Sequence, residues 1–214
     1  MTDHVKARRY SSPKRAEQAL QTRSAILKAA RAVFVERGYA AATIPEVARA
    51  AGVAVDTVYA AVGRKPVLFR LLIESALSGG DHPVEAEQRD YVQRIRQATS
   101  AGEKIAIYAA AIRPIQERIA PLFVALRDAS AQDAKLAALW REIAERRAAN
   151  MRLFAQDLAA TGELRTDLTL DEVADVVWST NAPEYYLLLV HDRGWTPERF
   201  ETWLADTWRR LLLA

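Results

Sequence analysis

Apolar positions follow a helical pattern along almost the whole chain. They recur at spacings of three and four, as in Ile26, Ala30, Val33 and Phe34 before Gly38. No segment alternates apolar and polar residues over four to eight positions between turn signals, so the pattern predicts no strand. The glycines fall between periodic segments, where a helix C-cap favours a residue that tolerates positive φ. The sequence therefore predicts an all-α fold.

Prolines and capping residues divide the second part of the chain into helices. Pro114, Pro121 and Pro183 should start or kink helices, because proline lacks a backbone donor. Polar residues that can cap a helix N-terminus stand at Asp133, Thr169 or Asp171, and Thr196. Together these signals predict helices near 84–99, 102–112, 114–130, 133–161, 170–191 and 196–213.

The charge is distributed unevenly along the chain. The 214 residues correspond to about one and a half domains of ~150 residues, and the net charge is only +3. Residues 1–70, however, hold 13 Lys and Arg against 5 Asp and Glu, whereas residues 71–214 hold 17 against 22. A basic first third is expected where that part meets a polyanion such as nucleic acid. A chance fluctuation of surface charge is the alternative.

The charge changes sign at residues 79–83, whose sequence is GGDHP. We expect a basic flexible arm over residues 1–22, a first domain over 23–80 and a second domain over 84–214. The basic side chains around the arm either meet the polyanion or belong to a solvated tail: Lys6, Arg8, Arg9, Lys14, Arg15 and Arg23.

The segment from Thr43 to Leu68 has the spacing of a helix-turn-helix. Thr43 can cap a first short helix, and Gly52 ends that helix. The small side chain of Ala48 lets two helices cross closely, and Val58 can pin the second helix on the first. The outer face of the second helix is then free to enter a major groove. Any helical hairpin with a glycine turn is the alternative interpretation.

These residues resemble the TetR family of bacterial transcriptional regulators over about residues 23–72. The resemblance rests on a string of residues at fixed spacing: Ile26, Leu27, Ala29, Ala30, Phe34, Glu36, Arg37, Gly38, Tyr39, Thr43, Ile44, Val47, Ala48, Ala51, Gly52, Val53, Thr57, Val58, Tyr59, Lys65 and Leu68. The resemblance implies a three-helix DNA-binding head, a linking fourth helix and a helical domain for ligand binding and dimerisation. It also implies a homodimer on a palindromic operator and a small-molecule effector.

The resemblance assigns DNA-contact roles to individual residues. Tyr59 matches a tyrosine that contacts a phosphate, and Lys65 matches a lysine at the start of the fourth helix that does the same. Thr43 and Thr57 match hydroxyl positions that either touch the DNA backbone or only cap a helix. Ala54 departs from the family pattern, which usually has a capping serine there, and Val62 replaces the usual aromatic residue.

The start of the second short helix adds two candidates for base contact. Val55 offers apolar contact to thymine methyl groups. Asp56 can accept from a cytosine amino group or favour the positive end of the helix dipole, and we favour the dipole.

Polar residues interrupt apolar stripes in the second domain, as a small-molecule pocket between helices would require. Arg147 and Asn150 break the face of the 133–161 helix, and a kink is expected next to Asn181. The candidate ligand residues are Tyr108, Arg113, Phe123, Trp140, Arg147, Asn150, Phe154, Trp178, Asn181 and Tyr185. A packed aromatic core with Arg147 covering it at the surface is the alternative.

The last two predicted helices carry wide apolar stripes, which suggests a second subunit as well as the protein's own core. The candidate dimerisation residues are Val177, Phe200, Trp203, Leu204, Thr207 and Leu211. A self-contained helical core is the alternative.

Enzyme chemistry finds little support in the sequence. There is no cysteine, the three histidines are far apart, and phosphate-loop and nucleophile-elbow motifs are absent. We expect no enzyme activity, no metal and no cofactor. The longest apolar run is far from the ~20 residues of a membrane span, and no secretory signal opens the chain, so we expect a cytoplasmic protein without a membrane partner.

Together these features predict a ligand-responsive repressor that a small molecule releases from its operator. A ligand-independent DNA-binding dimer, architectural or constitutive, is the first alternative. A helical enzyme is the second.

Overall fold

The computed structural model describes residues 13–79, 84–131 and 133–214. Within these ranges the chain folds into helices and forms no β-strand, apart from one isolated antiparallel bridge between Leu164 and Leu213. The predicted all-α fold is confirmed. None of the helices in these ranges has the length and apolar character needed to span a membrane.

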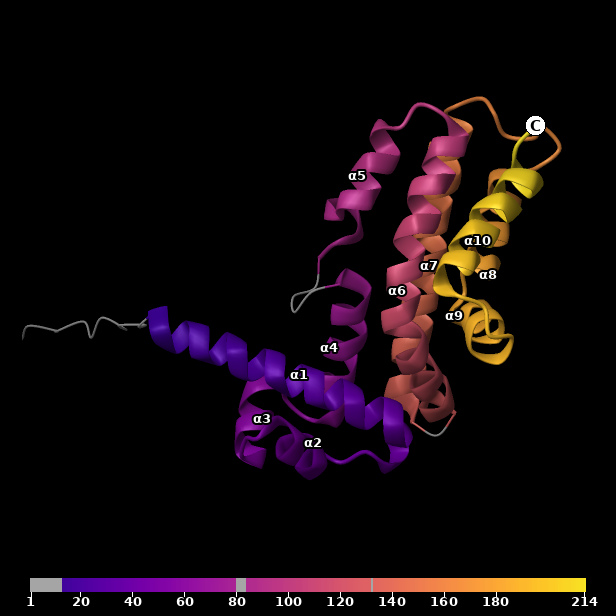
Figure 1. Ribbon diagram of the computed structural model, residues 1–214. Coiled ribbons are helices and arrows are strands. Elements are labelled where there is room, and N and C mark those ends of the chain that lie inside the picture. The colour runs from indigo at the N-terminus through magenta and orange to yellow at the C-terminus, as the bar shows by residue number, and fades with distance from the viewer. Residues whose placement is uncertain (1–12, 80–83, 132) are drawn as a thin grey trace, which may run out of the picture.

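The first four helices form a compact head (Figure 1). They are α1 (Pro13–Ala41), α2 (Ile44–Ala51), α3 (Val55–Val62) and α4 (Lys65–Ser78). Gly38 has a φ of 71°, so it turns the end of α1 towards α2. The head is closed by a cluster of rings: Phe34, Tyr39 and Phe69 pack with centroids 4.9–5.8 Å apart.

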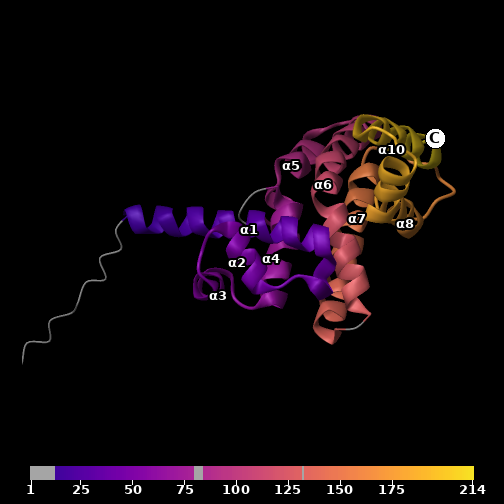
Figure 2. The same ribbon diagram turned by 60° about the horizontal axis from the view of Figure 1, so that its bottom comes forward.

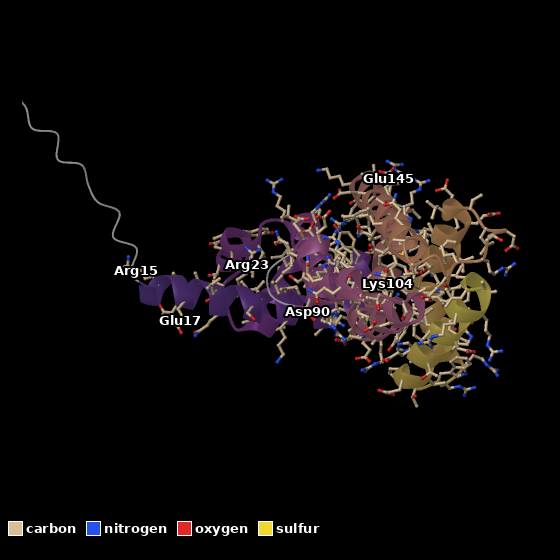
Figure 3. The ribbon with its side chains drawn as sticks, turned by 90° about the horizontal axis from the view of Figure 1, so that it is seen from above. Arg15, Glu17, Arg23, Asp90, Lys104 and Glu145 are labelled. Atoms are coloured by element: carbon tan, nitrogen blue, oxygen red, sulfur yellow. The ribbon has the colours of Figure 1, made fainter. Side chains whose placement is uncertain are left out.

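The helix α1 begins earlier than the sequence analysis expected. We placed residues 1–22 in a flexible arm, but residues 13–22 belong to α1. Residues 15–21 are exposed, and Figures 2 and 3 show this end of α1, with Arg15 and Glu17, projecting away from the body. Good helix formers such as Ala, Glu, Gln and Leu dominate here, so local propensity extends the helix beyond its packed part. Residues 1–12, with Lys6, Arg8 and Arg9, lie outside the described residues.

The second part of the chain is a bundle around two long helices, α6 and α7. Its elements are η1 (Ala86–Gln88), α5 (Asp90–Gln97), α6 (Ala101–Ser130), α7 (Ala134–Ala159), α8 (Leu170–Thr180), α9 (Pro183–Tyr186), the π-helical turn η2 (Leu187–Asp192) and α10 (Pro197–Leu212). Asp133, Thr169 and Thr196 cap α7, α8 and α10 as predicted.

Helix boundaries differ from the prediction in three places. The helix expected near 84–99 begins only at Asp90, after the short turn η1. We expected separate helices at 102–112 and 114–130, yet α6 runs through Pro114 and Pro121 without a break. Its buried residues on both sides of each proline pack against neighbouring helices, and this packing outweighs the lost hydrogen bonds. The expected 170–191 helix, in contrast, ends at Thr180. Ala182 is extended with ψ at 144°, because the residue before proline avoids the helical region.

The buried side chains form two clusters. One joins the head to the C-terminal half of α6 and the start of α7, and it includes Phe69, Leu122 and Leu136. The other unites α5, the N-terminal half of α6, the end of α7, α8 and α10 around Trp208. The long helices α6 and α7 therefore belong to both clusters, which places them between the head and the rest of the bundle.

Candidate nucleic-acid interface and ligand pocket

The helices α2 and α3 form the expected helix-turn-helix. Thr43 starts α2 with a capping box: its Oγ1 accepts from the Glu46 amide at 3.4 Å, and the Glu46 carboxylate accepts from the Thr43 amide at 2.9 Å. The Thr43 hydroxyl also donates to the Glu46 carboxylate at 2.8 Å, and this hydrogen bond, together with the one from the Thr43 amide, lowers the pKa of Glu46 below its ordinary value. Thr43 is thus a helix cap in this structure. Its contact with DNA stays a prediction.

The turn between α2 and α3 depends on Gly52. It has a φ of 69°, and the following amide of Val53 donates to the Ala48 carbonyl oxygen at 3.0 Å. Ala48 and Val58 are buried between the helices, as the spacing predicted. The crossing of α2 and α3 is therefore fixed by one glycine conformation and by small or branched apolar side chains.

Within the described part of the chain, the outer face of α3 is open to solvent. Asp56 and Tyr59 are exposed, and Val55 and Thr57 are half-buried at the edge of the same helix. Ala54 stands at the N-cap of α3 and gives this helix no side-chain hydrogen bond. The first amides of α3 are open to an anion such as a DNA phosphate.

Lys65 begins α4, as predicted, and is tied to the end of α1. Its Nζ donates to the Ala40 carbonyl oxygen at 3.2 Å and lies 4.4 Å from the centroid of the Tyr39 ring. Partial burial lowers the pKa of Lys65. Sequence reasoning missed Arg49 and Arg64, which are exposed at the end of α2 and directly before α4. In the sequence, the only feature that marks these two arginines as candidates for DNA contact is a positive charge next to a helix end.

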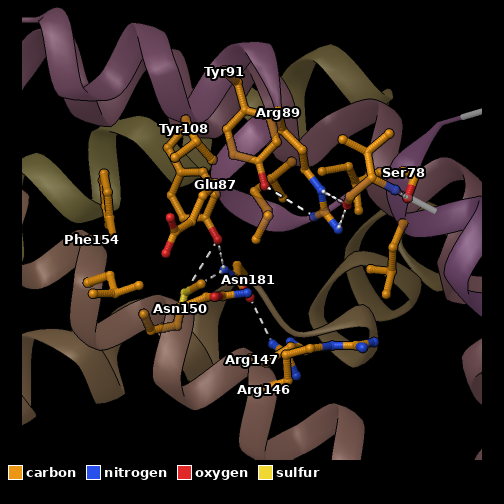
Figure 4. Close-up of a pocket in the computed structure, with 18 of the residues that line it drawn as sticks. Ser78, Glu87, Arg89, Tyr91, Tyr108, Arg146, Arg147, Asn150, Phe154 and Asn181 are labelled. Carbon is orange, nitrogen blue, oxygen red and sulfur yellow. Dashed lines mark hydrogen bonds between the residues drawn. The ribbon is translucent and has the colours of Figure 1, made fainter.

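A cavity of about 600 Å³ lies between α4, α5, α6 and α7 (Figure 4). This volume is within the range of small-molecule sites. Six of the ten predicted ligand residues line it: Tyr108, Phe123, Arg147, Asn150, Phe154 and Asn181. Leu77 and Ser78 of α4 contribute to its wall, so the cavity touches the head as well as the bundle.

A hydrogen-bond network centred on Asn181 forms the polar end of the cavity. The Asn181 amide donates to the Tyr108 hydroxyl oxygen at 3.2 Å, and its Oδ1 accepts from Arg147 Nη2 at 2.8 Å. Gln116 Nε2 donates to the Asn181 carbonyl oxygen. Asn181 and Gln116 are each only 3% exposed. Burial raises the pKa of Tyr108 far above its ordinary value, so its hydroxyl stays protonated at physiological pH.

Four predicted ligand residues do not line the cavity. Arg113 points to α10 and pairs with Glu201 at 2.7 Å, because it lies on the flank of α6 rather than on its inner stripe. Trp140 packs on Phe123 in the other cluster, at a centroid distance of 4.8 Å. Trp178 only supports the Arg147 guanidinium, 5.1 Å from its ring. Tyr185 is 40% exposed on the outer surface. The structure thus places these four residues outside the cavity lining.

Sequence reasoning also missed residues that do line the cavity. Gln116 is the clearest case: it stands eight residues after Tyr108 on α6, on the same apolar stripe. A buried polar residue on such a stripe is the same signal that identified Arg147. Tyr91 of α5 lines the mouth, and its ring stacks on Tyr108 at 6.0 Å.

Half of the predicted dimerisation residues belong to the protein's own core. Val177, Phe200 and Leu204 are 0% exposed and cannot contact a second subunit in this arrangement. The chain itself covers these three side chains, because α8 turns this face towards α7 and α10 turns it towards α6. Trp203, Thr207 and Leu211 retain exposed surface. Their role in dimerisation stays a prediction.

Within residues 13–79, 84–131 and 133–214, no three His, Cys, Asp or Glu side chains are arranged to hold a metal ion.

Residues 26–70 match the model of a family described as bacterial regulatory proteins, tetR family. No match to a curated protein sequence was found.

Solved structures with the same fold cover nearly the whole chain. A TetR-family transcriptional regulator from Mesorhizobium loti has a TM-score of 0.68 and 18% identity, over 92% of this chain and 99% of that one. A transcriptional regulator from Saccharomonospora viridis in complex with choline has a TM-score of 0.67 and 16% identity, over 91% and 98%. NalD of Pseudomonas aeruginosa, the secondary repressor of the MexAB-OprM multidrug efflux pump, has a TM-score of 0.66 and 18% identity, over 92% and 98%.

Proposed function

We propose that this chain, whose residues 26–70 match the model of the tetR family of bacterial regulatory proteins, is a ligand-responsive transcriptional repressor. Two copies bind a palindromic operator through α3, and a small molecule in the cavity releases them. One observation carries the proposal. The cavity wall includes Leu77 and Ser78 of α4, the helix that directly follows the helix-turn-helix.

The position of the cavity gives a ligand a mechanical route to the head. Arg118 of α6 donates to the Ala76 carbonyl oxygen of α4 at 2.9 Å, and Arg31 of α1 donates to backbone oxygens of Arg118 and Glu117. A ligand that spreads α4 from α6 would strain these contacts and shift the head. A tenfold loss of operator affinity requires only ~1.4 kcal/mol of coupling.

The known structures support the same assignment by analogy. NalD is described as a repressor, and the Saccharomonospora viridis regulator was solved with choline bound. A ligand-independent DNA-binding dimer is the second candidate. The exposed α3 face favours it equally, but it leaves the cavity of about 600 Å³ without a role.

The direct test is to sequence the genomic fragments that the purified protein retains and to measure its affinity for them. We expect a palindromic site with half-sites about one helical turn apart or a multiple of it. Binding should weaken steeply with salt, because neutralised phosphates release counterions. A compound that saturably lowers the affinity then establishes the ligand response. Salt-insensitive binding, or no retained fragment at low salt, would contradict DNA recognition.

The proposed dimer predicts a specific surface. Tyr185 is 40% exposed and its ring stacks on the half-buried Trp203 at 6.0 Å, and Leu188, three residues after Tyr185, is 52% exposed. We expect Leu188→Glu to convert the dimer to a monomer, because a charge in a two-fold contact would be buried without a partner. Light scattering measures the mass. Val35→Glu, at an exposed site on α1, is the control and should remain a dimer. If Leu188→Glu also remains a dimer, the interface does not include Leu188.

A further inference from the structure

Arg147 is a largely buried cation at the polar end of the cavity. Its Nη2 donates to the Trp178 carbonyl oxygen at 3.0 Å and to Asn181 Oδ1 at 2.8 Å. Its Nε and Nη1 have no acceptor among the described residues. Burial lowers the pKa of Arg147, which shows that the charged form is poorly solvated. A buried guanidinium with only neutral acceptors is costly unless an anion joins it.

The nearby carboxylates are occupied elsewhere. Glu184 pairs with Arg127 at 3.8 Å, and Glu142 pairs with Arg70 at 2.7 Å. Arg146, beside Arg147 on the cavity wall, likewise has no ion pair among the described residues (Figure 4). Arg146 is exposed to water, so Arg147 is the largely buried guanidinium at this end of the cavity that has no acidic partner from the described part of the chain.

Gln116 adds an unused acceptor to the same end. Its Nε2 is held by the Asn181 carbonyl oxygen, whereas its buried Oε1 has no hydrogen-bond partner among the described residues. Such an orphaned acceptor is rare in a folded interior. Gln116 and Arg147 both contact Asn181, so an acceptor and a cation converge on one small region of the cavity.

The rest of the wall is mostly apolar. It includes Ile112, Ile119, Phe123, Met151 and Phe154. Four acidic residues also line it. Glu85 and Glu87 are exposed, and Glu87 lies 3.9 Å from Arg96, so water solvates these two carboxylates. Glu74 and Asp157 are half-buried, and the Glu74 carboxylate lies 3.9 Å from the Arg70 guanidinium.

We propose that the cavity binds an amphipathic organic acid. Its carboxylate pairs with the Arg147 guanidinium, a hydroxyl or N–H group donates to Gln116 Oε1, and its apolar body packs on the Ile112, Ile119 and Phe154 side chains. A planar guanidinium is the side chain best suited to a carboxylate, because it offers two parallel donors. This inference rests on the proposed function, since it names the class of ligand for the same cavity.

The test compares two fluorescent probes that differ by one anionic group. Anilinonaphthalene sulfonate carries a sulfonate and an N–H donor, and N-phenyl-1-naphthylamine is the same skeleton without the sulfonate. We expect one saturable site per chain and at least tenfold tighter binding of the sulfonate. Decanoate should displace it, whereas decanol should not. Equal affinity for the two probes, equal displacement by decanol, or no saturable site overturns the inference.

Variants of Arg147 assign the preference to this side chain. Arg147→Gln should weaken sulfonate binding at least tenfold and leave the uncharged probe within about twofold, and Arg147→Lys should retain part of the preference. Arg141→Gln, exposed on the same helix, should change neither probe. If circular dichroism shows that Arg147→Gln is unfolded, Arg147→Lys decides. An unchanged ratio of the two affinities in the folded variant contradicts the assignment.

Operator binding, measured in parallel, separates this inference from the proposed function. If acids bind through Arg147 but no compound changes DNA affinity, the ligand class stands and the ligand response fails. If uncharged or cationic compounds bind better and release DNA, the response stands and the acid preference fails.

Discussion

Val58→Asp is expected to abolish DNA binding while the cavity keeps its ligand. Val58 is 0% exposed where α3 packs on α1 and α2. An unpaired carboxylate there costs several kcal/mol, a large fraction of the ~5–15 kcal/mol that stabilise a typical protein. The crossing of α2 and α3 is lost, so α3 is no longer presented to the major groove. We expect operator affinity to fall at least a hundredfold.

The polar end of the cavity is expected to persist in Val58→Asp because its residues belong to the other cluster, whereas the lining residues Ile119 and Phe123 share the cluster of Val58. Tyr108, Met151 and Phe154 pack with α8 and α10, away from α3. Probe binding is therefore the internal control, and Ala110→Asp, which adds the same charge at an exposed position of α6, is the matched variant. Retained operator binding by Val58→Asp would show that α3 is not the element that reads DNA.

The helix-turn-helix was predictable because its signals are local. The Thr43 cap, the Gly52 turn and the buried Val58 each depend on a few neighbouring residues, and all three take the expected place in the structure. The continuous α6 was not predictable in this way. Pro114 and Pro121 are local break signals, and only the packing of residues far away in the sequence overrides them.

The cavity was predictable in part for the same reason. Polar residues on an apolar stripe identified Arg147, Asn150 and Asn181, and all three line it. The periodicity does not fix which neighbour each flank of a helix faces. Arg113, one residue after the inward Ile112, therefore faces Glu201 instead. Which helices lie next to each flank depends on the tertiary structure, and the apolar pattern of a single helix does not predict it.

The dimerisation residues show a related limit. A wide apolar stripe indicates how much surface a helix buries. It does not indicate whether the same chain or a second chain covers that surface. Phe200 and Leu204 are covered by the chain itself, whereas the neighbouring Trp203 keeps part of its ring exposed. Residues one position apart on α10 thus differ in how completely their own chain covers them.

Trp208→Ala is expected to cause the largest loss of stability of any single truncation in the bundle. Trp208 is the largest of the fully buried side chains among the described residues. Its indole Nε1 donates to Thr180 Oγ1 at 2.8 Å, and its ring stacks on Tyr108 at 5.4 Å. Truncating a buried tryptophan to alanine costs about 3–5 kcal/mol, because apolar contacts are lost and a cavity remains. For a chain of this size, that lowers Tm by about 6–20 °C.

The same substitution should also weaken ligand binding, because Trp208 supports the cavity from behind. Without the indole, Tyr108 can tilt into the vacated space, and its hydroxyl then leaves the Asn181 amide that also orients Arg147. Trp208→Phe keeps most of the stacking surface, so its losses in both stability and probe affinity should be smaller. Trp195→Ala, at a half-buried site before α10, is the control.

If calorimetry gives Trp208→Ala the same Tm as Trp195→Ala, the packing around Trp208 does not hold the bundle together. If Tm falls but probe affinity is unchanged, Tyr108 is positioned by Asn181 and Phe154 rather than by the indole.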